Sequence, residues 1–160
     1  MKQEQFVAMS HSPVEKKIVT MTINGTYMES WSWLLVHQRN VPGQDKPYRI
    51  EKNDKGSMPE ASPYERELIA LRNALQKVHG PVVLYIKMRK GHVFSALTSG
   101  LAYKWQAAFF RDVRGYKTPY AQLWCDVMHE IMRLKNEGAS FYITSVKCAR
   151  TRPASLRNVA

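Results

Sequence analysis

The most regular pattern of apolar and polar positions lies in the stretch Ser62–Met88. It opens with S-P-Y-E, a capping box in which the Ser62 hydroxyl and the Glu65 carboxylate satisfy the first helical turn. Apolar residues then follow at steps of four and three, which predicts one face of an α-helix: Tyr64, Leu68, Leu71, Leu75 and Val78. The apolar run Val82–Ile86 predicts a strand buried on both faces. A capped helix that leads into a buried strand indicates an α/β domain.

Three strands are predicted before this helix. Lys16–Met28 is rich in β-branched residues, Ser30–His37 is largely apolar, and Tyr48–Lys52 alternates in polarity. The polar stretch Asn53–Ala61 predicts a loop. Asn24-Gly25 is open to two interpretations: a two-residue hairpin turn, or the edge of a site at the end of a strand.

The second half of the chain predicts helices and one last strand. His92–Leu101 is moderately helical in pattern, and Tyr103–Val113 and Tyr120–Asn136 are clearer amphipathic helices. Arg114–Lys117 is a basic and aromatic loop between them. Ser140–Lys147 predicts the final strand, and a short basic tail follows it.

Length and composition indicate a single domain. The chain has 160 residues and is 44% hydrophobic, which suffices for a sizeable core. We expect residues 1–15 to be a loose N-terminal arm and residues 16–160 to form the domain. No apolar run is long enough to span a membrane. The two cysteines, Cys125 and Cys148, are far apart in sequence, which favours free thiols in a reducing compartment and a cytoplasmic location over a disulfide.

The charge of the chain favours a polyanionic partner. The formal net charge is +11 and the isoelectric point is near 9.8. Residues 1–80 hold 11 Lys/Arg and 9 Asp/Glu, a balance of +2, whereas residues 81–160 hold 13 and 4, a balance of +9. Because this excess is concentrated and interleaved with aromatics, nucleic-acid contact is a better interpretation than mere solubility.

Several short motifs recur in the order and spacing of a known family. They are Ile23-Asn24-Gly25-Thr26, Arg66-Glu67-Leu68-Ile69-Ala70, Ile86-Lys87-Met88, Gly115-Tyr116-Lys117-Thr118 with Leu123-Trp124, and Val146-Lys147-Cys148-Ala149 with Pro153. In type 1 ribonucleases H the corresponding places read T-D-G-S, M-E-L with alanines, T-D-S, G-W-K-T with L-W, and V-K-G-H with a later proline. The chain resembles this family along nearly its full length at low identity. The resemblance implies a ribonuclease H-like α/β fold: a five-stranded mixed sheet of three antiparallel strands and parallel additions, flanked by helices.

The same resemblance implies that the active site is degenerate. Family members hold two Mg²⁺ ions with four carboxylates. Only Glu67 keeps its acid here. Asn24 and Lys87 stand where two others are expected, and the fourth falls at Asn158 or Val159. The resemblance therefore implies no metal ion and no cofactor. Mg²⁺ would enter only if acids from elsewhere, such as Glu65 or Glu29, rebuilt a site around Glu67.

Lys87 and Asn24 each allow a structural and a functional interpretation. Lys87 could be a solvated charge, it could form an ion pair with Glu67, or it could contact a phosphate where a metal ion once neutralised charge. Asn24, with Gly25 and Thr26, could be only a turn, or it could contact a ribose hydroxyl or a phosphate.

The resemblance also implies a nucleic-acid-binding surface that includes a basic protrusion. In the family this protrusion grips the DNA strand of a hybrid. Aromatic residues among cations suit stacking combined with phosphate neutralisation. Trp105 is expected to pack in the core, and residues 147–152 could instead be a flexible basic tail. The full set of predicted nucleic-acid contacts is Asn24, Gly25, Thr26, Lys87, Lys90, Lys104, Arg111, Arg114, Tyr116, Lys117, Lys147, Arg150 and Arg152.

Three functions are compatible with these observations. The first is a catalytically inactive ribonuclease H-like protein that binds RNA, an RNA–DNA hybrid or another duplex through its basic half. The second is an active metal-dependent ribonuclease H or nuclease with a rearranged site around Glu67. The third is a scaffold subunit with a protein partner in a nucleoprotein or phage-encoded inhibitory assembly.

Overall fold

The structure is a computed structural model and describes residues 16–146. It contains one mixed sheet of five strands in the order β3-β2-β1-β4-β5. β1 pairs antiparallel with β2, and β2 pairs antiparallel with β3. β1 and β4 are parallel, as are β4 and β5. The expected architecture is therefore confirmed. The strands are β1 (Lys17–Asn24), β2 (Ser30–Arg39), β3 (Tyr48–Ser57), β4 (Val82–Met88) and β5 (Ser140–Ser145).

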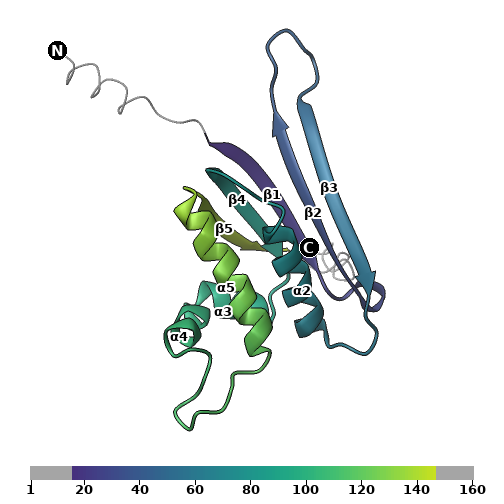
Figure 1. Ribbon diagram of the computed structural model, residues 1–160. Helices are drawn as coiled ribbons and strands as arrows, with labels where there is room; N and C mark the ends of the chain where they lie inside the picture. Colours follow the sequence, from purple (N-terminus) through teal and green to yellow (C-terminus); the bar gives the residue numbers. More distant parts are fainter. Residues whose placement is uncertain (1–15, 147–160) are drawn as a thin grey trace, which may run out of the picture.

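The described α-helices lie on one face of this sheet (Figure 1). They are α2 (Pro63–Leu75), α3 (His92–Thr98), α4 (Leu101–Ala107) and α5 (Ala121–Asn136), and a short 3₁₀ turn, η1 (Tyr27–Glu29), joins β1 to β2. The core lies between helices and sheet. It is formed by alternate residues of the strands and by the inward faces of α2 and α5, including Met21, Ile23, Trp33, Leu84, Ile86, Leu68, Leu71, Leu75, Trp124, Val127 and Leu134.

The N-terminus of α2 forms where the capping pattern predicts, with the Ser62 half of the capping box in place. Ser62 has extended backbone angles, and its hydroxyl accepts a hydrogen bond from the Glu65 N–H at 3.1 Å. Pro63 occupies the first helical position. The same hydroxyl lies 3.0 Å from the Tyr120 hydroxyl, which connects this cap to the start of α5. The cap therefore fixes both the start of α2 and its position against a second helix.

The third strand is longer than the sequence pattern predicted. The loop expected at residues 53–61 begins only after Ser57, because β3 pairs with β2 along its whole length. Its residues are polar on both sides because β3 is an edge strand, so polarity alone suggested a loop. Gly56 pairs with Trp31, and a Cβ at Gly56 would lie 2.6 Å from the indole ring. Glycine there lets the aromatic ring lie on the edge strand.

Three other predictions were wrong in detail. β4 is not buried on both faces. Burial alternates along the strand, and the side chains of Tyr85 and Lys87 are exposed. The helix predicted over residues 103–113 ends at Ala107, because Phe109 and Phe110 take positive φ angles that cannot continue a helix. The helix predicted over residues 92–101 is likewise interrupted at Gly100, whose φ of 84° separates α3 from α4.

The predicted N-terminal arm of residues 1–15 and the basic tail with Lys147, Arg150 and Arg152 lie outside the described residues. Within residues 16–146, no helix has the length and apolar character needed to cross a membrane.

The Ser62 cap gives a test of the fold. We expect Ser62→Ala to lower the free energy of unfolding by about 1 kcal/mol, since the Glu65 N–H loses its partner. Urea denaturation measures this. Ser95→Ala, at an exposed position within α3, is the matched control and should change stability by less than about 0.5 kcal/mol. Equal effects of the two substitutions would contradict the role of the cap.

Candidate functional site

The candidate site lies where the parallel strands β1 and β4 end at the same edge of the sheet. Their ladder pairs Thr22 with Lys87. β1 then ends at Asn24, and β4 ends at Met88, which Arg89 directly follows. Glu67 faces the same place from α2, the helix that packs against β1 and β2. Three segments distant in sequence thus bring an amide, a guanidinium and a carboxylate together.

Glu67 is the acid at the centre of this arrangement. It is 2% exposed, although carboxylates are seldom buried unless they are paired. Its Oε2 accepts a hydrogen bond from Arg89 Nε, and the two side chains form an ion pair. Burial raises the pKa of the Glu67 carboxyl, and the nearby Arg89 guanidinium opposes that rise only in part. The carboxylate is therefore held by a cation of the protein itself.

The structure corrects the expected role of Lys87. Its neighbours Ile86 and Met88 point into the core below the helices, so Lys87 is exposed on the opposite face of β4. The partner of Glu67 is Arg89, not Lys87. Arg89 directly follows β4, whereas the resemblance had placed Lys87, within β4, as the replaced acid. The pattern V-V-L-Y-I-K-M-R-K does not show which of its basic residues meets Glu67.

Asn24 ends β1 and organises the turn after it. Its Oδ1 accepts hydrogen bonds from the N–H groups of Thr26 and Tyr27, both at 3.0 Å. The 3₁₀ turn η1 then follows, so the two-residue hairpin interpretation of Asn24-Gly25 was wrong. The side-chain oxygen of Asn24 is occupied by backbone donors, whereas its amide nitrogen is a donor that could meet a ribose or phosphate oxygen.

Gly25 is required by its close approach to α2. A Cβ at this position would lie 2.7 Å from both Cγ and the backbone nitrogen of Glu67 and 2.9 Å from the Pro63 carbonyl oxygen. Any side chain here would push the end of β1 away from α2. Gly25 therefore brings the β1 turn into contact with Glu67, and the interpretation of Asn24-Gly25 as the edge of a site stays a prediction.

Arg66 is a residue of the site region that sequence reasoning missed. It is 5% exposed, and its guanidinium donates hydrogen bonds to the carbonyl oxygens of Gly25 at 2.7 Å, Met58 at 3.0 Å and Ala61 at 2.5 Å. It thus ties the turn after β1 to the segment between β3 and α2. One feature of the sequence could have identified Arg66. It is an arginine next to Glu67, among apolar neighbours on a helix, at a place where the family motif reads methionine.

The described residues offer no preformed metal site. Nowhere in residues 16–146 do three or more His, Cys, Asp or Glu side chains gather closely enough to hold a metal ion. In particular, Glu65 and Glu29 do not join Glu67 in such a group. Mg²⁺ requires several oxygen ligands in octahedral geometry. The arrangement around Glu67 instead supplies one carboxylate that is already paired with a cation.

A second candidate surface is the loop between α4 and α5, here called the protrusion loop (residues 108–119). Arg111 and Lys117 form a β-bridge at its base. At its tip, Asp112 Oδ1 accepts hydrogen bonds from the N–H groups of Arg114 and Tyr116, both at 2.9 Å. These bonds give the loop a defined shape, and it projects from the domain (Figure 1).

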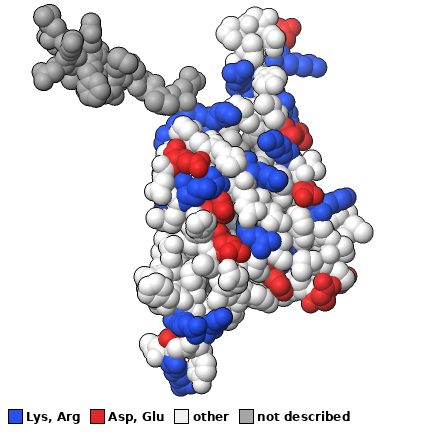
Figure 2. All heavy atoms as spheres, in the orientation of Figure 1, with Lys and Arg blue, Asp and Glu red and all other residues white. Residues whose placement is uncertain are grey.

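The protrusion loop combines cations with exposed aromatic surface. Arg111, Arg114 and Lys117 are exposed, and Tyr116 is 67% exposed. Blue side chains gather at this loop at the bottom of Figure 2, whereas Lys/Arg and Asp/Glu are mixed over much of the same face. Lys104 is exposed on the neighbouring α4. Trp105 packs edge-on against Trp124 with ring centroids 5.5 Å apart, as expected for a core residue. Lys104 thus lies on the helix that precedes the protrusion loop, while Lys90 follows Arg89 after the end of β4.

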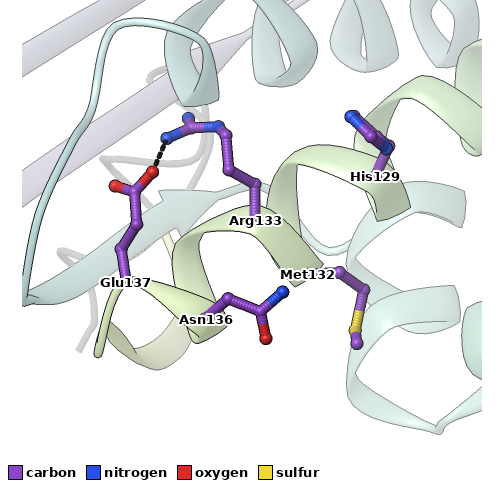
Figure 3. Close-up of a pocket in the computed structure, with 5 residues that line it drawn as sticks. All are labelled: His129, Met132, Arg133, Asn136 and Glu137. Carbon is purple, nitrogen blue, oxygen red and sulfur yellow. Dashed lines mark hydrogen bonds and ion pairs between the residues drawn. The ribbon is translucent and has the colours of Figure 1, made fainter.

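A third feature, an open depression of about 440 Å³ along α5, has a structural explanation. It is lined by His129, Met132, Arg133, Asn136 and Glu137 (Figure 3). Arg133 pairs with Glu130 and Glu137 and donates to the carbonyl oxygens of Leu75 and Val78. A hydrogen bond from the Gly80 N–H, together with Arg133, lowers the pKa of Glu137. These contacts join the end of α5 to the turn between α2 and β4.

The raised pKa of Glu67 predicts a pH dependence of stability. A carboxyl group whose folded pKa lies above its ordinary value of 4.5 binds more protons in the folded state, so stability falls as pH rises from 4.5 through the folded pKa. Glu67→Gln removes this titration and keeps the shape of the side chain. We therefore expect the wild-type protein to lose stability relative to Glu67→Gln over this window. Urea denaturation of both proteins at a series of pH values measures it, and a constant difference would contradict the buried-acid description.

Comparison with known proteins gives the fold and no family. No protein-family model matches the chain, and no curated protein matches it. Among solved structures, LC9-RNase H1, described as a type 1 RNase H with the type 2 active-site motif, aligns with a TM-score of 0.59 at 11% identity. That alignment covers 86% of this chain and 66% of the other, so the chain spans slightly less than two thirds of the length of this relative.

Two viral structures align similarly. The solution structure of the PFV RNase H domain gives a TM-score of 0.51 at 10% identity, covering 88% of this chain and 84% of that domain. The native Prototype Foamy Virus protease-reverse transcriptase gives 0.52 at 12% identity, covering 92% of this chain and 20% of that protein. Identities this low are informative about architecture alone. With the strand order and helix placement described above, they show that the chain has the ribonuclease H-like fold.

Proposed function

We propose that this protein is a catalytically inactive ribonuclease H-like protein that binds RNA, an RNA–DNA hybrid or another duplex. The observation that carries the proposal is the buried ion pair between Glu67 and Arg89 at the end of β1 and β4. A guanidinium occupies the place next to the one acid that the resemblance retains. The pair neutralises that acid without a metal ion.

The chemistry of phosphodiester hydrolysis explains why this pair opposes catalysis. Two metal ions must stabilise both the attacking and the leaving oxygen, which requires several carboxylates at one place. Glu67 is engaged by Arg89, and the Asn24 oxygen accepts two backbone hydrogen bonds. A divalent cation would have to displace Arg89 against electrostatic repulsion. This arrangement supports the proposal that the protein does not carry out metal-assisted hydrolysis.

Binding, in contrast, needs only cations and stacking surfaces on a rigid support. The protrusion loop supplies exposed Arg111, Arg114 and Lys117 beside Tyr116, and its internal hydrogen bonds limit the entropy lost on binding. Lys90 adds a cation at the strand edge. Such contacts to phosphates release counterions, so affinity should fall steeply with salt.

The protrusion loop gives the first test of binding. We expect the double substitution Arg114→Gln and Lys117→Gln to weaken binding of an RNA–DNA hybrid and to reduce the salt slope by about 2, one for each lost phosphate contact. Fluorescence anisotropy at several salt concentrations measures both effects. Lys77→Gln, an exposed lysine just beyond α2, is the matched control and should behave as the wild type. An affinity that does not change with salt would contradict the proposal.

Absence of cleavage gives the second test. With hybrid, double-stranded RNA, double-stranded DNA and single strands, we expect intact product on denaturing gels in either Mg²⁺ or Mn²⁺. Cleavage that disappears in Glu67→Gln would instead establish the rearranged metal-dependent nuclease. If no nucleic acid binds at low salt but a partner is retained after nuclease treatment, the scaffold function would replace the proposed one.

A further inference from the structure

The face of the sheet opposite the described helices carries an unusual set of side chains. Alternation along the strands turns every second residue away from α2 and α5. On β1, β4 and β5 these residues are apolar, aromatic, basic, or bear a hydroxyl or an amide: Ile18, Thr20, Thr22, Asn24, Val83, Tyr85, Lys87, Ser140, Tyr142 and Thr144. The three strands contain no Asp or Glu at all. We call this surface the tyrosine face.

Two tyrosines form the centre of the tyrosine face. Tyr85 on β4 and Tyr142 on β5 are direct neighbours in the parallel ladder. Their rings stack with centroids 5.2 Å apart and planes inclined by 21°. They remain 37% and 53% exposed. Among the strands of residues 16–146 β5 lies at the edge of the sheet, and about half of the Tyr142 surface is exposed to meet another planar group.

Cations stand at both ends of this stacked pair. Lys87 and Thr144 lie two residues further along their strands, about 7 Å away. At the other end, Lys16 reaches across the sheet and its Nζ donates to the Ser140 hydroxyl at 3.1 Å. A short polyanion that follows β5 would therefore meet a lysine, an aromatic pair and a second lysine in turn.

We propose that the tyrosine face binds single-stranded nucleic acid, with a base stacked on Tyr142 and phosphates near Lys87 and Lys16. Every base has a π-face, so such stacking requires no particular sequence. Flat aromatic surface among cations and hydroxyls, without a carboxylate, matches the chemistry of a nucleotide chain. A second copy of this protein is a poorer occupant, because two such faces would bring lysines together without an acid to pair them.

The tyrosines of this surface are separate from the protrusion-loop residues on which the proposed duplex binding rests, although Lys87 is also one of the predicted nucleic-acid contacts. Glu67 is buried on α2, whereas Tyr85 and Tyr142 lie on the face of the sheet that is turned away from α2 and α5. The two surfaces could hold a duplex and an adjoining single strand of one molecule. Either surface can fail experimentally without the other, so their tests are separable.

The test uses the full chain and a fluorescein-labelled oligouridine of about ten nucleotides, within the usual range of such sites. At physiological salt, we expect Tyr142→Ala to weaken binding by about 5- to 150-fold, the range for loss of one base–aromatic stack. Tyr142→Phe keeps the ring and should bind as the wild type. Lys87→Gln should reduce the salt slope by about 1. Urea denaturation of all variants shows whether they remain folded.

The protrusion-loop double variant separates the two proposals. It should weaken binding of the hybrid and leave oligouridine binding unchanged. Tyr142→Ala should weaken oligouridine binding and leave hybrid binding unchanged. Oligouridine binding that is equal in wild type, Tyr142→Ala and Lys87→Gln would overturn the inference, whatever happens to the hybrid. A dimer seen by light scattering that dissociates in Tyr142→Ala would also overturn it and assign the face to self-association. Were Tyr142→Ala unfolded, the salt slope of Lys87→Gln would decide alone.

Discussion

A carboxylate buried at the meeting point of two strands and a helix is the constraint on which this site depends. Burying a charge costs several kcal/mol unless a partner compensates it. Arg89 is that partner, and its position follows from the parallel register of β1 and β4. Gly25 must then be small, because the turn after β1 lies against the backbone of Glu67. The identity of each residue is tied to that of the others.

Arg66 extends the same principle to the surrounding segments. It is a buried cation whose hydrogen-bond partners in the described structure are carbonyl oxygens, on the turn after β1 and on the approach to α2. Carbonyl dipoles can satisfy a guanidinium that is shielded from water. Side-chain cations thus hold together loops that would otherwise be free to separate around Glu67.

The sequence predicted the elements better than their extents. Capping residues located the start of α2 correctly because they are a local signal, whereas the helical spacing ran on to Val78 beyond the end of α2 at Leu75. The length of β3 and the end of the helix before the protrusion loop depend on pairing with β2 and on the backbone angles at Phe109 and Phe110, which are not local in sequence. For the site, Glu67 and Asn24 could be identified from motifs. Arg89 could not, because only the strand register shows which basic residue meets the acid.

The coupling of Glu67 to Arg89 also has an evolutionary consequence. Substituting Arg89 first would leave a buried carboxylate unpaired, at a cost of about 3–5 kcal/mol, which is a large part of the stability of a typical domain. Substituting Glu67 first would remove the acid that any metal site would need. A lineage with this pair would therefore have to change several positions together to gain a metal centre. Single substitutions that start from this ion pair therefore do not lead readily to a metal-binding site.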